Sequence, residues 1–151
     1  MSAIRLGRLE DVPVLVQLWH AMLVECDLVG SGLVPDWQTR LTDAFRAEMR
    51  SGRAVWFVAP KGDAIAGTCV IFEQTGRSQI HLDRRATLGG MYVRQAFRGN
   101  GIGSALANAA IDWCKSNGFA LIRLHASDAG RPIYEKLGFV TATEMMRLNL
   151  P

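Results

Sequence analysis

The stretch over 88–116 constrains the fold more than any other part of the chain. An apolar run over 88–93 leads into the glycine-rich turn Arg98-Gly99-Asn100-Gly101-Ile102-Gly103, and apolar residues at helical spacing then run from Ile102 to Trp113. In a strand–glycine turn–helix unit, the unpaired N–H groups of the first helical turn and the positive end of the helix dipole meet at one point. Such a point binds phosphate groups. The segment therefore predicts a site for a phosphate-bearing ligand.

The apolar pattern of the whole chain predicts an α/β (α+β mixed) fold, a central mixed sheet with helices on both faces. The strand–helix–strand unit over 88–124 supplies a parallel pair with a right-handed crossover, and the hairpins on either side of it supply antiparallel neighbours. Helices are expected over 9–25, 36–50, 102–116 and 129–137. Strands are expected over 3–6, 54–59, 64–72, 88–93, 120–124, 139–140 and 145–150, and a mobile polar loop is expected over 74–86.

Length and composition indicate one domain over 1–151, because about 100–200 residues form a single domain. The apolar runs are shorter than the roughly 20 residues that span a bilayer, so no membrane association is expected. Charged residues near the N-terminus, Arg5 and Arg8, interrupt what a signal peptide needs as its apolar centre. A cytoplasmic protein is the expectation that follows.

The cysteines and the basic residues argue against two further classes of protein. Cys26, Cys69 and Cys114 form no C-x-x-C pair, which indicates neither a metal site nor a disulfide framework, and the last two are expected to be buried thiols. The formal net charge is +3, and its cations are mostly scattered arginines. Without a long basic run interleaved with aromatic residues, no nucleic-acid partner is expected.

Three kinds of glycine-rich phosphate loop can be compared with this turn. A nucleotide P-loop requires Gly-Lys-Ser/Thr, whereas Gly103 is followed by Ser104 and no lysine is present. The dinucleotide fingerprint G-x-G-x-x-G fails because its third glycine would fall on Ser104 or Leu106. The pattern R-x-x-G-x-G fits Arg98 to Gly103. On this motif the chain resembles the GNAT superfamily, the acyl-CoA-dependent N-acetyltransferases.

Further residues support that resemblance. Tyr92-Val93 ends the strand before the motif, and Tyr134 to Phe139 matches the family's Y-x-x-x-G-F ending. The expected order of elements matches the family fold over essentially all 151 residues. The resemblance implies an N-acetyltransferase that moves an acetyl group from acetyl-CoA to a primary amine, by direct attack in a ternary complex and without a metal.

The resemblance also implies which residues hold the cofactor. The backbone of the strand before the turn would pair with the pantetheine arm like an added strand, and Gly89-Gly90 would form a bulge in that strand. The pyrophosphate would lie on the amides of the glycine turn, with Arg98 pairing with phosphate or bracing the loop. The expected cofactor-binding residues are Met91, Tyr92, Val93, Arg98, Gly99, Asn100, Gly101, Ile102, Gly103, Ser104 and Ser127. Ser127 stands where the family has Asn, and Gly130 where it has Ala.

Tyr134 is the expected catalytic residue. A phenol with a pKa near 10 stays protonated at neutral pH and can donate a proton to the departing thiolate of CoA. The family often places a carboxylate near the bulge as a base, but here that region reads Leu88-Gly89-Gly90-Met91. Candidates for a base elsewhere, among which the sequence does not choose, are His20, Glu25, Asp27, Glu73, His81 and His125.

The acceptor side is less well defined by the sequence. The family builds this side largely from its first two helices, where Glu25 could meet an ammonium and Trp37 could line a pocket. A small-molecule amine is the favoured partner, and edge strands of such a sheet are compatible with a homodimer. Two alternatives stay open, a non-catalytic acyl-CoA-binding or sensing module of the same fold and a peptide or protein N-acetyltransferase. The identity of the amine and the use of longer acyl groups are not predicted.

Overall fold

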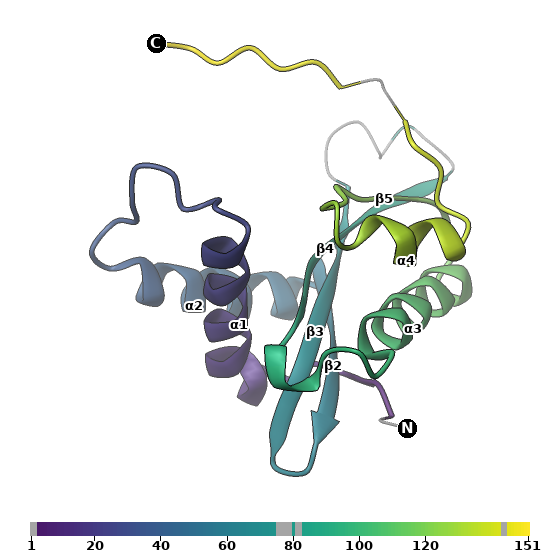
Figure 1. Ribbon diagram of the computed structural model, residues 1–151, viewed down its shortest axis with the longest axis horizontal. Helices are drawn as coiled ribbons and strands as arrows, with labels where there is room; N and C mark the ends of the chain where they lie inside the picture. Colours follow the sequence, from purple (N-terminus) through teal and green to yellow (C-terminus); the bar gives the residue numbers. More distant parts are fainter. Residues whose placement is uncertain (1–2, 75–79, 81–82, 143–144) are drawn as a thin grey trace.

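The computed structural model describes residues 3–74, 80, 83–142 and 145–151. Five of its strands form one sheet in the order β1-β2-β3-β4-β5. Neighbours from β1 to β4 run antiparallel, and β4 and β5 run parallel. The predicted mixed sheet is therefore confirmed (Figure 1). The strands are β1 (Arg5–Leu6), β2 (Ala54–Lys61), β3 (Ala64–Glu73), β4 (Arg84–Val93) and β5 (Phe119–Arg123).

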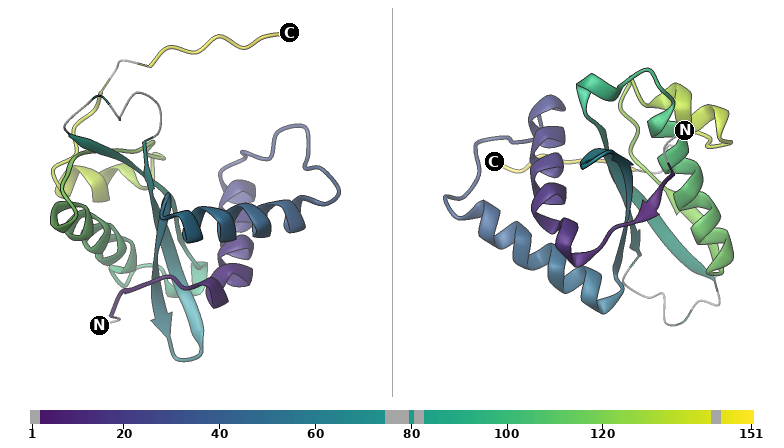
Figure 2. Two further views of the ribbon diagram at one scale, coloured as in Figure 1. Left: turned by 180° about the vertical axis from the view of Figure 1, so that it is seen from behind. Right: turned by 90° about the horizontal axis from the view of Figure 1, so that it is seen from below.

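Helices cover both faces of the sheet, as predicted. One face carries α1 and α2, and the other carries α3 and α4 (Figures 1 and 2). Single turns of 3-10 helix precede α1 and α3, at Leu9–Asp11 and Gln95–Phe97. The helices are α1 (Val12–Glu25), α2 (Trp37–Ser51), α3 (Ile102–Ser116) and α4 (Arg131–Lys136).

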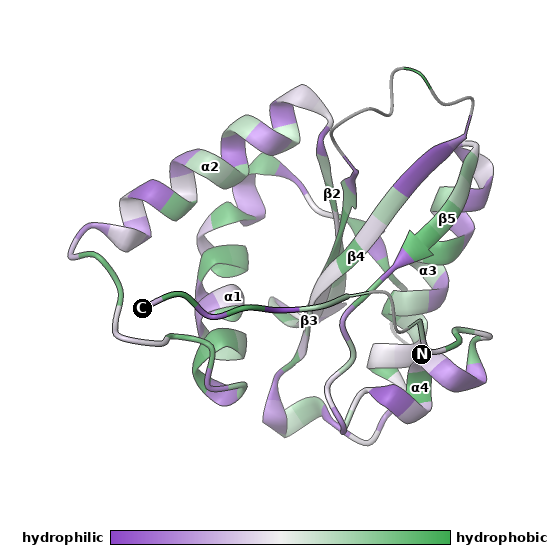
Figure 3. Ribbon diagram, turned by 90° about the horizontal axis from the view of Figure 1, so that it is seen from above, coloured by the Kyte–Doolittle hydropathy of each residue, from purple (hydrophilic) through white to green (hydrophobic). Residues whose placement is uncertain are grey.

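Side chains along the central strands point alternately to the two faces of the sheet, and this produces two separate hydrophobic cores. On β2, Trp56 and Val58 pack towards α1 and α2, whereas Phe57 and Ala59 pack towards α3. Successive side chains of a strand point to opposite faces, so a strand covered on both sides is apolar throughout. The helices instead alternate hydrophilic and hydrophobic residues around their circumference, most visibly α2 (Figure 3). The buried thiols predicted at Cys69 and Cys114 are confirmed, and burial raises the pKa of both.

Two predictions about irregular and strand segments are wrong. The expected loop over 74–86 ends early, because β4 begins at Arg84; residues 75–79 and 81–82 of that loop lie outside the described residues. The expected strands over 139–140 and 145–150 are not formed. Val140 and the apolar side chains of the last segment are 73–95% exposed, and the segment runs away from the sheet (Figure 2). An alternating pattern forms a strand only where a neighbouring edge supplies hydrogen bonds.

Candidate active site

The parallel pairing of β4 and β5 covers only the first half of β4. It runs from the pair Arg84 and Phe119 to the pair Thr87 and Arg123. Beyond Thr87, the segment 88–93, which we name the open segment of β4, remains paired with β3 but has no β5 partner. Its backbone is therefore available to an extended ligand on the β5 side. The predicted residues Met91, Tyr92 and Val93 all lie on this segment.

A bulge interrupts the open segment. Val70 of β3 lies opposite Gly89 and Thr68 lies opposite Tyr92, so β4 has one more residue than β3 over this interval. Gly90 has a φ of +58°, and a Cβ atom there would lie 2.9 Å from Cζ3 of Trp19. The predicted bulge at Gly89-Gly90 is confirmed. Gly90 is the position that requires glycine, because its backbone is left-handed and α1 packs directly against it.

The glycine turn connects the open segment to the start of α3. Gly99 and Gly101 have φ values of +80° and +74°, so glycine serves the backbone conformation of the turn. Among the residues that the structure describes, no side chain caps α3. The first amide bonded back to the turn is that of Ala105, which donates to the Gly101 carbonyl at 3.0 Å. The N–H groups of Ile102 and the two residues after it, Gly103 and Ser104, therefore precede the helical hydrogen-bond ladder and can bind an anion.

Side chains of the turn hold its shape. The Asn100 amide donates to the carbonyls of Phe97 and Arg98, at 3.1 and 3.3 Å. Ile102 is 5% exposed and packs into the core, so only its backbone faces the turn. A Cβ on Gly103 would lie 3.5 Å from Cδ1 of Ile133, which brings α3 and α4 close together here. The predicted residues of the turn thus offer backbone amides rather than side chains.

Arg98 braces the turn against α1. Its guanidinium forms a two-point ion pair with Glu25 at 2.7 and 2.8 Å, and its Nε donates to the Val93 carbonyl at 2.8 Å. The Arg98 hydrogen bond lowers the pKa of Glu25, with a smaller contribution from the Tyr92 hydroxyl. Of the two roles expected for Arg98, the structure shows loop bracing. Glu25, expected on the acceptor side, has its carboxylate engaged by this pair.

Tyr134 lies on α4 and points into the core beneath the sheet. It is 8% exposed and belongs to the same buried cluster as Cys69, the β3 residue opposite the bulge. Burial raises the pKa of Tyr134 to about 12, with a smaller contribution from Cys69. The phenol therefore stays protonated throughout the neutral range and can donate a proton there.

The turn before α4 positions this tyrosine. The Ser127 hydroxyl accepts a hydrogen bond from the Gly130 amide at 3.1 Å. A Cβ on Gly130 would lie 3.2 Å from both Ser127 Oγ and Tyr134 Cε2, so glycine lets the tyrosine ring pack against the turn. Ser127, expected to bind the cofactor, thus also organises the turn that carries Tyr134.

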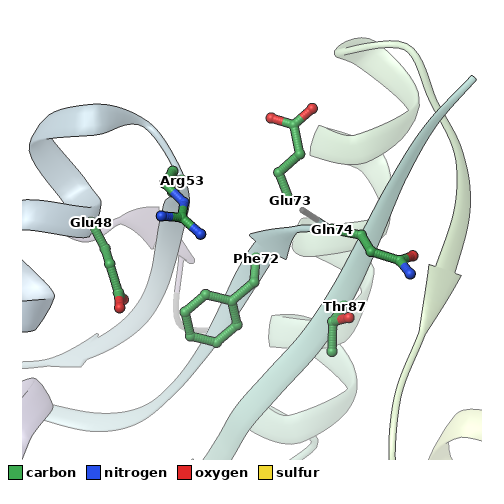
Figure 4. A pocket seen from close by; sticks show the side chains of 6 residues that line it. All are labelled: Glu48, Arg53, Phe72, Glu73, Gln74 and Thr87. Carbon is green, nitrogen blue, oxygen red and sulfur yellow. The ribbon is translucent and has the colours of Figure 1, made fainter. Parts of the chain in front are cut away.

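A pocket of about 330 Å³ opens on the α1–α2 face of the sheet (Figure 4). Phe72 and Thr87 are direct partners across β3 and β4, and both line it. Glu73 forms a two-point ion pair with Arg84 at 2.8 and 3.0 Å. The pocket is lined by Glu48, Arg53, Phe72, Glu73, Gln74 and Thr87.

The pocket includes residues that the sequence did not single out and excludes some that it did. Glu48 and Arg53 lie at the end of α2, where charged residues ordinarily face solvent, and no spacing motif marks them. Trp37 instead stacks on His20 with ring centroids 4.4 Å apart. Among the other proposed bases, Asp27 and His125 are exposed, and His81 lies outside the described residues.

The described residues contain no group of three or more His, Cys, Asp or Glu side chains arranged to hold a metal ion. Within the same residues, no helix is long and apolar enough to cross a membrane.

Sequence comparison identifies the family. The profile of the Acetyltransferase (GNAT) family matches residues 17–139, which is most of the chain. The chain belongs to the GNAT acetyltransferase family. Glucosamine 6-phosphate N-acetyltransferase from Trypanosoma brucei brucei is 33% identical over 79 residues, which are 52% of this chain and 50% of the relative. The chain therefore aligns with about half the length of this curated relative.

Solved structures share the fold over nearly the whole chain. The crystal structure of a predicted acetyltransferase with acetyl-CoA from Clostridium acetobutylicum superposes with a TM-score of 0.82 and 26% identity, covering 99% of this GNAT chain and 96% of the other. Glucosamine-6-phosphate N-acetyltransferase from Arabidopsis thaliana superposes with a TM-score of 0.75 and 19% identity, covering 100% and 99%. At 19% identity the similarity shows the fold alone.

Proposed function

We propose that this chain transfers the acetyl group of acetyl-CoA to the primary amine of a small molecule, by direct attack in a ternary complex. One observation carries the proposal: the open segment of β4 leads directly to the uncapped start of α3. An extended amide-containing arm and a diphosphate occur in this order in CoA. The backbone of Met91–Val93 suits the first, and the amides of 102–104 suit the second.

The residues of the chain have distinct roles in the proposed reaction. Acetyl-CoA supplies an activated acyl thioester. The amine nitrogen forms a bond to the acyl carbon, the carbon–sulfur bond breaks, and the amine gives up a proton to solvent. Tyr134 Oη donates a proton to the departing sulfur and recovers one from solvent. A positioned acid of this kind typically contributes about 10²–10⁴-fold to the rate.

A small acceptor is supported by the size of the pocket and by the relatives. A volume of about 330 Å³ is near the lower end of ligand pockets, which span roughly 300–1,000 Å³. The Trypanosoma brucei brucei relative is named for an amino sugar phosphate. We therefore include glucosamine 6-phosphate among the candidate acceptors of this chain.

The test is release of free thiol from acetyl-CoA in the presence of an amine panel. The panel contains glucosamine 6-phosphate, glucosamine, amino acids, polyamines and short peptides. Release that depends on a small amine supports the proposal, and release with peptides alone would move the acceptor to a different class. Tight acetyl-CoA binding without amine-dependent release on the whole panel would contradict catalysis and favour a sensing module.

A further inference from the structure

Two residues that line the pocket on the α1–α2 face each have a buried polar atom without a hydrogen-bond partner among the described residues. Among the described residues, three buried side-chain atoms lack a partner: Glu48 Oε2, Gln74 Oε1 and Trp56 Nε1. The first two belong to residues that line the pocket on the α1–α2 face. Both atoms are acceptors closed to solvent, and a buried acceptor left unpaired costs about 1–3 kcal/mol. Rotation of either side chain towards a ligand N–H group in the pocket would remove this cost.

Of the three charged side chains that line the pocket, one is held in an ion pair and two are not paired within the part of the chain that the structure describes. Glu73 is already neutralised by its two-point pair with Arg84. No ion pair joins Glu48 or Arg53 to another described residue. The pocket therefore has one carboxylate and one guanidinium available to a ligand, and Arg53 is the more exposed of the two.

The end of α2 fixes these two residues near one another. Gly52 has a φ of +76°, and the Arg53 amide donates to the Glu48 carbonyl at 3.0 Å. This hydrogen bond is the 6→1 bond of a Schellman motif, and the motif sets the direction of the chain as it leaves the helix. In Figure 4, Glu48 and Arg53 lie on one side of the pocket and Thr87 on the other, with Phe72 between them.

The pocket adjoins the bulge in the open segment of β4. Phe72 lines the pocket, and its Cε2 lies 3.7 Å from the position that a Cβ would take on Gly89. Thr87 lies two residues before Gly89 on the same strand and faces the same side of the sheet. A ligand in the pocket would thus lie beside the bulge, next to the backbone that we propose for the extended arm of CoA.

We propose that Glu48 and Arg53 select an acceptor carrying both an amine and an anionic group. Glu48 and Gln74 accept hydrogen bonds from the amine, and Arg53 binds the anion at the exposed side of the pocket. This inference rests on the proposed function, because it assigns the acceptor class of the same enzyme. It names Glu48 of α2 and Arg53, which lies between α2 and β2, as the residues that determine specificity.

Binding to the CoA-loaded protein tests the assignment without requiring turnover. Calorimetric titrations compare glucosamine 6-phosphate, which has both groups, with glucosamine and glucose 6-phosphate, which each have one. The wild-type chain should bind the first at least tenfold more tightly than either of the others. Glu48→Gln should remove the advantage over glucose 6-phosphate, and Arg53→Gln should remove the advantage over glucosamine.

Matched controls come from the same helix. Asp43→Asn and Arg50→Gln make the same chemical changes at exposed positions outside the pocket, and they should leave all three affinities within about twofold. Equal affinities of the wild-type chain for the three sugars, or no binding, would overturn the assignment. The same holds if Glu48→Gln lowers the melting temperature but weakens all three sugars equally, as expected of a carboxylate with a structural role alone.

Thiol release separates this inference from the proposed function. If an amine drives release and Glu48→Gln and Arg53→Gln leave its KM unchanged, the acceptor assignment is wrong and the proposed function stands. If the sugars bind as expected and no amine on the panel drives release, the pocket binds such ligands but the proposed function is wrong.

Discussion

Gly90 sits where α1 packs on the bulge, and replacing it with alanine tests this contact directly. Its φ is +58°, and the new Cβ would lie 2.9 and 3.1 Å from two atoms of the Trp19 ring and 3.2 Å from Val70 Cγ1. The ring has little room to retreat. Its centroid lies 5.6 Å from that of Phe45, 6.0 Å from that of Trp56 and 6.5 Å from that of Phe72.

Two costs add in Gly90→Ala. A residue with a Cβ in the left-handed region costs about 1–2 kcal/mol. Inserting a methyl group into a packed core costs about 1–3 kcal/mol more. The free energy of unfolding should therefore fall by about 2–5 kcal/mol, a large share of the 5–15 kcal/mol typical of a domain.

Gly62→Ala is the matched control. Gly62 has a φ of +59°, and no atom lies within 4 Å of its added Cβ, so only the backbone cost applies. Urea unfolding at 25 °C, followed by circular dichroism, gives both free energies. The difference between the two variants measures the contacts of the added methyl group with Trp19 and Val70, since the backbone cost and the loss of unfolded-chain entropy are shared. If Gly90→Ala is no more destabilising than Gly62→Ala, the packing of α1 on the bulge is refuted.

Three further predictions concern single side chains. Tyr134→Phe should lower turnover at least tenfold while leaving acetyl-CoA affinity unchanged. The wild-type rate should show no loss from ionisation of this phenol up to about pH 10, because its pKa is raised to about 12. Unchanged turnover of the variant, with chemistry shown to be rate-limiting, would contradict this prediction. Asp11→Asn should cost about 1–3 kcal/mol at pH 7 because Asp11 accepts two hydrogen bonds from Arg5. The Arg5 hydrogen bond lowers the pKa of Asp11 below its ordinary 3.8. The stability difference between wild type and Asp11→Asn is therefore full above pH 3.8 and is lost as the pH falls through the pKa of Asp11 in the folded chain. Urea unfolding at a series of pH values measures it. Glu25→Gln should change the free energy of unfolding by less than about 1 kcal/mol, since its pair with Arg98 is exposed, and high salt should shrink the effect.

The sequence predicted the strand, glycine turn and helix over 88–116 because their conformation depends on local chemistry. Gly99 and Gly101 adopt the positive φ values that only glycine reaches easily, and an apolar strand and an amphipathic helix flank them. Each of these signals lies within about 30 consecutive residues. The bulge at Gly90 was predicted from a family resemblance, and the structure supplies its physical reason in the contact with Trp19.

The pocket on the α1–α2 face could not be predicted because long-range packing creates it. Glu48 has the ordinary pattern of a polar residue on an amphipathic helix, and only the fold brings it into one pocket with Phe72 of β3 and with Gln74, which follows β3. The strand predicted over 145–150 failed for a related reason. Its alternating pattern is real, but nothing local determines whether a sheet edge lies within reach. The short start of β4 was missed because Arg84 and Arg85 are polar, although their backbones pair with β5.

Arg84 joins three parts of the chain with one side chain. It pairs with Glu73 of β3, donates to the Asn117 carbonyl at the end of α3 at 2.8 Å, and lies 4.1 Å from the ring centroid of Phe119 on β5. Arg84 and Phe119 are also the first paired residues of the parallel β4–β5 ladder, which ends at Thr87. Arg84 therefore ties the start of β4 to β3, to the end of α3 and to β5, at the end of β4 away from the open segment. A substitution at this position would release all three contacts at once and loosen the ladder that holds β5 against β4.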